Sequence, residues 1–156
     1  MQSEYEELMK LALLEGELAL NHGDVPVGAL VVFEGRIIAS RHNEREKSGD
    51  PTAHAEILAL RDASQLLDSW RLIDCSLVVT LEPCLMCAGA TLNSRVRKVI
   101  FGAFDPNGGA MSSLYGVHCD PRLNHNCEIV SGVLKHDSEL LIRRFFQSNR
   151  KAKNME

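Results

Sequence analysis

Two short stretches of the sequence hold side chains that bind metal ions and transfer protons. His54 and Glu56 stand two positions apart in "DPTAHAEILAL", and Cys84 and Cys87 stand three positions apart in "EPCLMC". Two thiolates and one imidazole provide three zinc ligands, and a catalytic zinc site leaves its fourth position to water. Glu56, beside the metal but not bound to it, would exchange protons with that water. These residue types therefore point to metal-assisted hydrolysis.

The spacing of His54 and Glu56 is explained if both act at the end of a helix. Side chains three or four positions apart share a helix face, whereas positions i and i+2 do not. At the first turn, however, several side chains reach a point near the axis, where free N–H groups and the helix dipole favour negative charge. The segment Asp50-Pro51-Thr52 contains a capping residue and a helix-starting proline. We therefore expect a helix that begins at Pro51 or Thr52 and ends near Leu67.

Cys84 and Cys87 are expected to share a face at the start of another helix, directly after a strand. A redox dithiol is one alternative for a Cys-x-x-Cys pair, but it leaves His54 and Glu56 without a role. A closed structural zinc site is a second alternative, in which a fourth ligand comes from a cluster later in the chain: His118, Cys119, His125 or Cys127. We interpret those four residues as loop side chains and inert thiols.

Apolar patterns elsewhere predict the elements that hold these residues in place. In chain order, they are a helix over 3–21 that opens with a capping box at Ser3 and Glu6, a hairpin of strands over 27–33 and 36–40, a polar loop over 41–49, a strand over 76–81, a helix that opens near 84, a strand over 98–103, a loop over 104–118, a strand over 128–133 and a helix over 137–149. Strands that alternate with helices indicate one α/β domain over 1–156, with helices on both faces of its sheet.

The composition narrows the class of protein. A chain of 156 residues with 45% hydrophobic and 24% charged residues makes one globular domain with its own core. No apolar run approaches membrane-spanning length and the N-terminal segment has no secretory pattern, so we expect a cytoplasmic protein with no membrane contact. Five cysteines in such a chain indicate thiols or metal ligands rather than a disulfide framework.

The uneven distribution of charge along the chain is compatible with a local contact to nucleic acid. A net charge of −4 argues against a protein that binds non-specifically along nucleic acid. Near the C-terminus, however, five cations follow one another with no acid between them: Arg143, Arg144, Arg150, Lys151 and Lys153. This run is either a contact surface for RNA or an ordinary solvated helix face.

The order of the two motifs carries a resemblance to a known family. His54-x-Glu56 followed by Pro83-Cys84-x-x-Cys87 is the signature of zinc-dependent base deaminases. From about Tyr5 to Arg150 the chain resembles the bacterial tRNA-specific adenosine deaminases of the cytidine deaminase-like superfamily, most densely in "DPTAHAEILALR", "LVVTLEPCLMCAGA" and "VIFGAFDP".

That resemblance implies a fold, an activity and an assembly. The fold is a three-layer α/β/α domain with a central mixed sheet of about five strands, in a homodimer with one Zn²⁺ per subunit and a site near the subunit interface. The activity is hydrolytic deamination of the wobble adenosine to inosine in a tRNA anticodon stem-loop. Zinc-bound hydroxide attacks the ring carbon that bears the amino group, Glu56 shuttles the protons, and ammonia leaves.

The resemblance also assigns roles to individual residues. His54, Cys84 and Cys87 correspond to the zinc ligands, and Glu56 corresponds to the proton shuttle. Asn43 corresponds to the residue that hydrogen-bonds the target base, and Val27 to part of the base pocket. Four further residues correspond to positions near the bound RNA: Asp105, Arg144, Phe145 and Arg150.

Two other functions share part of this pattern. A zinc deaminase of a free base or nucleoside, such as guanine or cytidine, would use the same metal chemistry. A non-enzymatic, zinc-stabilised RNA-binding module would need a closed site with four ligands and would have no use for Glu56. The basic C-terminal run and the matches around the motifs favour the tRNA deaminase.

Overall fold

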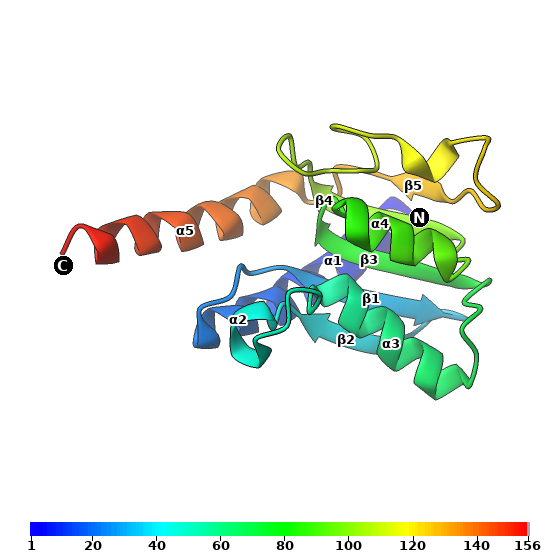
Figure 1. Cartoon of the computed structure of the whole chain (residues 1–156), viewed down its shortest axis with the longest axis horizontal. Helices are drawn as coiled ribbons and strands as arrows, with labels where there is room; N and C mark the ends of the chain where they lie inside the picture. The colour runs from blue at the N-terminus through cyan, green and yellow to red at the C-terminus, as the bar shows by residue number, and fades with distance from the viewer. Residues whose placement is uncertain (156) are drawn as a thin grey trace.

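A mixed sheet of five strands forms the centre of the molecule, in the order β2-β1-β3-β4-β5 (Figure 1). The computed structural model describes residues 1–155, so the last residue of the expected 1–156 domain lies outside the described part. In chain order, the strands are β1 (Gly28–Phe33), β2 (Arg36–His42), β3 (Cys75–Leu81), β4 (Lys98–Ala103) and β5 (Glu128–Val130). β1 is antiparallel to β2 and β3, whereas β3, β4 and β5 are parallel. The predicted mixed sheet is confirmed.

Helices cover both faces of this sheet, as predicted. In chain order, they are α1 (Gln2–Glu17), the short 3₁₀ helix η1 (Leu18–His22), α2 (Arg45–Ser48), α3 (Ala55–Leu67), α4 (Leu85–Asn93), the short 3₁₀ helix η2 (Val117–Cys119) and α5 (Lys135–Lys153). In Figure 1, α3 and α4 lie in front of the sheet, α1 lies behind it, and α5 projects beyond its edge. No helix within residues 1–155 is both long enough and apolar enough to cross a membrane.

The alternation of side chains along the strands produces two hydrophobic layers. Leu30, Val78 and Ile100 of the three central strands pack with Met9 and Ala12 of α1. The residue that follows each of these along its strand points to the opposite face and packs with alanines of α3 and α4. Because successive strand residues point to opposite faces, fully apolar strands are what a sheet covered on both sides requires.

The structure corrects three local predictions. α1 is capped at Met1 without a side-chain hydrogen bond, so the capping box predicted at Ser3 is wrong. Residues 41–49 are not simply a loop, because β2 continues to His42 and α2 follows. α5 extends to Lys153, four residues beyond its predicted end at Asn149.

The predicted start of α3 is also wrong, and its correction affects the site. The Asp50 carboxylate accepts hydrogen bonds from the backbone N–H and the hydroxyl of Thr52, both at 2.8 Å, so this segment forms a turn. Such a local turn competes with helix formation. α3 therefore begins at Ala55, with His54 as its N-cap. His54 and Glu56 lie closer to the helix end than predicted, which strengthens their expected convergence there.

Candidate active site

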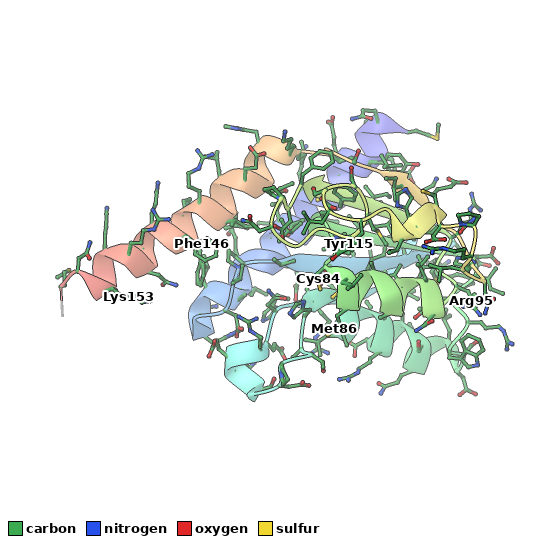
Figure 2. The ribbon with its side chains drawn as sticks, turned by 45° about the horizontal axis from the view of Figure 1, so that its top comes forward. Cys84, Met86, Arg95, Tyr115, Phe146 and Lys153 are labelled. Atoms are coloured by element: carbon green, nitrogen blue, oxygen red, sulfur yellow. The ribbon has the colours of Figure 1, made fainter. Side chains whose placement is uncertain are left out.

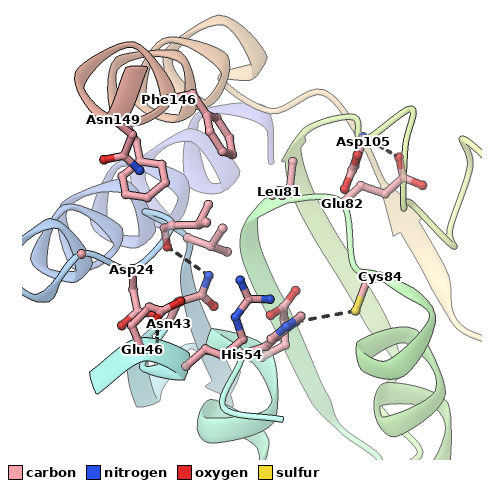
Figure 3. Close-up of a pocket in the computed structure, with 16 residues that line it drawn as sticks. Asp24, Asn43, Glu46, His54, Leu81, Glu82, Cys84, Asp105, Phe146 and Asn149 are labelled. Atoms are coloured by element: carbon pink, nitrogen blue, oxygen red, sulfur yellow. Dashed lines mark hydrogen bonds between the residues drawn. The ribbon is translucent and has the colours of Figure 1, made fainter. Parts of the chain in front are cut away.

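Three metal-ligating side chains meet where the N-termini of α3 and α4 approach each other, and Figure 3 shows two of them, His54 and Cys84. His54 is the N-cap of α3, Cys84 is the N-cap of α4, and Cys87 lies in the first turn of α4. His54 Nδ1 lies 3.6 Å from Cys84 Sγ and 3.5 Å from Cys87 Sγ. A tetrahedral zinc ion with bonds of about 2.1 Å to nitrogen and 2.3 Å to sulfur places these atoms about 3.6 Å apart. The donor types and their separations therefore fit Zn²⁺.

These three side chains also influence one another electrostatically. The hydrogen bond from Cys87 lowers the pKa of the Cys84 thiol to about 4, and the same bond raises the pKa of Cys87. The hydrogen bond to Cys84 raises the pKa of His54. A cation shared by the two sulfurs would favour the thiolate form of both.

A fourth protein ligand does not join this group in residues 1–155. His54, Cys84 and Cys87 are the group of ligand atoms that lie within 4.8 Å of one another. The four residues considered for a closed structural site lie outside this group: His118 and Cys119 belong to η2, His125 bonds the carbonyl of Val96 at 2.7 Å, and Cys127 is buried in the core. Three ligands and an open position are typical of a catalytic zinc site.

Glu56 lies beside the metal ligands and lines the same pocket. It is the second residue of α3 and is only 4% exposed. Burial raises the pKa of Glu56 to about 6. A carboxyl group that titrates near neutrality can both accept and release a proton.

Asn43 connects two walls of the pocket. Its Nδ2 group donates to the carbonyl oxygen of Val25 at 3.0 Å, and its Oδ1 accepts from the backbone N–H of Ala55 at 2.8 Å. Its own backbone N–H donates to the carbonyl oxygen of Val27 at 3.2 Å. Asn43 is therefore a structural link between the 25–27 segment and α3, as well as a pocket residue.

The pocket has a volume of about 360 Å³ and brings together most of the predicted site residues. His54, Glu56 and Cys84 line it together with Val27, Asn43, Asp105 and Phe145. Arg144 and Arg150 do not line it, since both are exposed on α5.

Nine pocket residues were not predicted as site residues: Gly23, Asp24, Val25, Arg45, Glu46, Leu81, Glu82, Phe146 and Asn149. Phe146 is 46% exposed and lies at the rim of the pocket, whereas its neighbour Phe145 is 8% exposed and is buried. Figure 2 shows Phe146 projecting from α5. Glu82 alone had a sequence signal, because an acidic residue that ends an apolar strand beside Cys84 is unusual. The others reach the pocket only through the tertiary fold.

Comparisons of the sequence find one family over most of the chain. Residues 2–103 match the cytidine and deoxycytidylate deaminase zinc-binding region. The tRNA-specific adenosine deaminase of Bacillus subtilis is 48% identical over 145 residues, which cover 93% of this chain and 90% of that protein. The tRNA-specific adenosine deaminase of Haemophilus influenzae is 42% identical over 158 residues, which cover 100% of this chain and 91% of that protein.

Solved structures show the same fold. A structure from studies of A-to-I editing by tRNA:A34 deaminases superposes with a TM-score of 0.82 at 41% identity, covering 85% of this chain and 96% of that one. A guanine deaminase from Nitrosomonas europaea superposes with a TM-score of 0.74 at 27% identity, covering 90% of this chain and 83% of that one.

Proposed function

The chain belongs to the zinc-binding cytidine and deoxycytidylate deaminase family, among the tRNA-specific adenosine deaminases, and from this we propose that it converts the wobble adenosine of a tRNA anticodon loop to inosine. The observation that carries the proposal is the arrangement of one open three-ligand zinc centre and the buried Glu56 on a single pocket. The reaction is hydrolytic: a carbon–oxygen bond forms, the carbon–nitrogen bond to the amino group breaks, and ammonia leaves.

His54, Cys84 and Cys87 hold the zinc ion in this proposal. A zinc ion bound there would lower the pKa of a water molecule to about 7 and so supply the nucleophile at neutral pH. Glu56 accepts the proton of that water and passes it to the ring nitrogen beside the reacting carbon. Glu56 then takes the remaining proton from the hydroxyl group now bonded to the carbon and delivers it to the departing amine, which leaves as ammonia. A residue in this role must stand beside the metal without binding it, which is the position of Glu56.

The base is held by residues from the walls of the pocket. Asn43 uses one N–H of its amide for Val25 and retains the other for a hydrogen bond to the base. Val27 is buried and presents an apolar surface to a planar ring. The rings of Phe145 and Phe146 lie with their centroids 5.2 Å apart at the far side of the pocket, where they provide further apolar surface.

The position of α5 favours RNA over a free base. This helix borders the pocket through Phe145, Phe146 and Asn149, and then continues with exposed cations to Lys153. We assign Arg144 and Arg150 to the RNA backbone and Asp105 to the nucleotides beside the target. An anticodon loop suits this site, because its bases leave the stack at lower cost than those of a duplex.

The enzyme is proposed to act as a cytoplasmic homodimer. Leu85 and Met86 follow Cys84 in the first turn of α4 and are 54% and 37% exposed. Figure 2 shows Met86 close to Cys84. A second subunit would cover this apolar surface, which supports an interface near the site.

An inosine assay tests the proposal. Zinc-loaded protein is incubated with an anticodon stem-loop that carries a wobble adenosine, and separately with adenosine, cytidine and guanine. Inosine in the stem-loop alone supports the proposal, and a stem-loop with guanosine at the wobble position is the matched control. Deamination of guanine alone would instead assign the chain the activity of its Nitrosomonas europaea structural neighbour. Ammonia release from none of the substrates would contradict both activities.

A further inference from the structure

Glu82 is a buried carboxylate that takes no part in zinc binding or proton transfer. It follows the end of β3, stands two residues before Cys84, and is 2% exposed. Its backbone N–H donates to the carbonyl oxygen of Ala103 at 2.8 Å, which continues the pairing of β3 with β4. A buried charge is stable only when its oxygens are well hydrogen-bonded, so its partners define what it does.

All four partners of the Glu82 carboxylate come from one loop, residues 104–116, which follows β4. One oxygen accepts from the backbone N–H of Asp105 at 3.1 Å and from the hydroxyl of Ser113. The other oxygen accepts from the backbone N–H of Met111 at 3.2 Å and from that of Ser113 at 2.9 Å. The carboxylate therefore holds both ends of the nine-residue segment 105–113 at a single point beside the zinc ligands.

The same loop lies directly against the segment that carries Cys84. Gly109 forms a β-bridge with Cys84, and the backbone N–H of Ala110 donates to the carbonyl oxygen of Pro83 at 2.9 Å. A Cβ atom added at Gly109 would meet the Glu82 carboxyl carbon at 2.2 Å. Only glycine permits this close approach of the loop to the carboxylate. In Figure 3, Glu82 and Asp105 lie side by side on the wall opposite Asn43.

We propose that Glu82 is a positioning residue that holds the 104–116 loop, and with it Asp105, in the shape that receives the RNA. The step from loop shape to RNA binding rests on the proposed function. A loop that is ordered before binding loses less conformational entropy when the substrate arrives. Glu82 therefore acts on substrate binding through the loop, whereas the ligands and Glu56 act on the chemistry.

The chemistry of the clamp requires an ionised carboxylate. Each of its four partners is a donor, and a carboxylate has about four acceptor positions on two oxygens. Glutamine has the same shape but offers one oxygen and turns an NH₂ group towards N–H donors. The substitution Glu82→Gln thus removes the clamp while it changes the volume of the side chain very little.

The test compares E82Q with S113A, which removes one of the four hydrogen bonds and leaves the carboxylate in place. Zinc content, kcat and KM for the stem-loop, and hydrogen exchange of the Asp105, Met111 and Ser113 amides are measured for each. For E82Q we expect retained zinc, faster exchange at these three amides, and a KM raised by about tenfold, because the loop must then be ordered when the RNA binds. The kcat should change much less, and S113A should show the same pattern more weakly.

Two results would overturn the proposal. One is a KM that stays at the wild-type value although the three amides exchange faster, since the loop shape would then not matter for the RNA. The other is unchanged exchange in both variants, which would show that Glu82 does not hold the loop. If E82Q does not fold, S113A and G109A provide the same readouts from the loop side. A wild-type enzyme that ignores the stem-loop would contradict the proposed function, while the exchange data would still decide whether the clamp exists.

Discussion

Asn43 Oδ1 lies 2.8 Å from the backbone nitrogen of Ala55, the first residue of α3. The N-cap of this helix, His54, makes no side-chain capping bond of its own, so Asn43 supplies the cap from a different segment of the chain. One amide thus stabilises the helix end that carries His54 and Glu56 and also faces the base pocket. The helix cap and the proposed contact with the base are therefore coupled through this residue.

Asn43→Ala is expected to lower both stability and activity. Loss of a helix cap costs about 1 kcal/mol in the free energy of unfolding, and the base loses a hydrogen bond at the same time. Asn43→Asp keeps an oxygen for Ala55 but has no N–H for the base. Urea unfolding should place N43D between wild type and N43A, whereas its kcat/KM should be no better than that of N43A. An N43D enzyme with wild-type kcat/KM would refute the base contact.

Much of this site could be predicted from sequence because its chemistry is local. Cys84 and Cys87 share one helical turn, and His54 and Glu56 share another, so residue type and spacing sufficed to group them. The error at the start of α3 was also local, since the turn formed by Asp50 prevailed over the helix-starting tendency of proline.

Other parts of the site depend on contacts between distant residues, and no local pattern predicts them. Glu82 and Ser113 are separated by 31 positions, and Asn149 reaches the pocket only because α5 crosses its rim. The second role of Asn43 was missed for the same reason, because its partner lies 12 positions away. Periodicity reports which face of an element is buried but not which side chain from another element will meet it.

Glu56→Ala is expected to abolish turnover and to retain the metal. The carboxylate is not among the three ligands, so zinc content should remain near one per chain. Loss of a general acid–base group typically lowers kcat by about 10²–10⁴-fold. Metal analysis and single-turnover inosine formation check both parts, and Cys87→Ala is the control that should lose zinc. Loss of zinc from E56A would show that Glu56 helps to hold the metal.

Replacement of Arg144, Arg150 and Lys151 by alanine is expected to weaken RNA binding and its dependence on salt. All three are exposed on α5. Each contact with a single-strand phosphate contributes about 0.7 to the slope of log K against log salt concentration, so the slope should fall by about 2. Binding of the stem-loop is measured between low and physiological salt. A matched triple variant at the exposed Arg36, Arg61 and Arg97 should keep the wild-type slope. Equal slopes in the two triple variants would show that the cations of α5 do not contact the RNA and form an ordinary solvated surface.

Asp24→Asn is expected to lower the free energy of unfolding at neutral pH. It should also make the free energy of unfolding less dependent on pH in the acid range. Burial opposes ionisation of Asp24, but hydrogen bonds from the backbone N–H groups of Glu46 and Lys47 and from His22 outweigh it and hold the pKa below its usual range. Because the pKa of Asp24 is lower in the folded protein than in the unfolded chain, the ionised carboxylate stabilises the fold. This contribution to the free energy of unfolding is complete above the unfolded pKa of about 3.9, and it is lost as the pH falls through the folded pKa.

Unfolding in urea between pH 3 and 7 checks this prediction for Asp24. D24N should lose about 1–3 kcal/mol of unfolding free energy at pH 7, because buried donors lose their charged acceptor. The difference from wild type should shrink as the pH falls below about 4. A difference that stays constant across this range would show that the ionised carboxylate is not the source of the stability.

His22 and His42 are expected to share one proton between them. Their Nε2 atoms lie 3.1 Å apart, while His22 Nδ1 lies 2.6 Å from the Asp24 carboxylate and His42 Nδ1 lies 2.9 Å from the Glu15 carboxylate. An ionised carboxylate only accepts hydrogen bonds, so both Nδ1 atoms must carry protons. A single proton between the two Nε2 atoms then forms the hydrogen bond that joins the rings.

Nitrogen-15 NMR of the imidazole groups of His22 and His42 tests directly which ring nitrogens carry protons. Both Nδ1 signals should be those of protonated nitrogens, and the two Nε2 signals should be intermediate between protonated and free. In H42F, His22 loses its nitrogen partner, and its Nε2 signal should change to that of a nitrogen exposed to solvent. Because the pair links α1 and β2 to Asp24 at the pocket wall, H42F should also accelerate hydrogen exchange at the Glu46 and Lys47 amides. A His22 Nε2 signal that is the same in the wild-type protein and in H42F would contradict the hydrogen bond between the two rings.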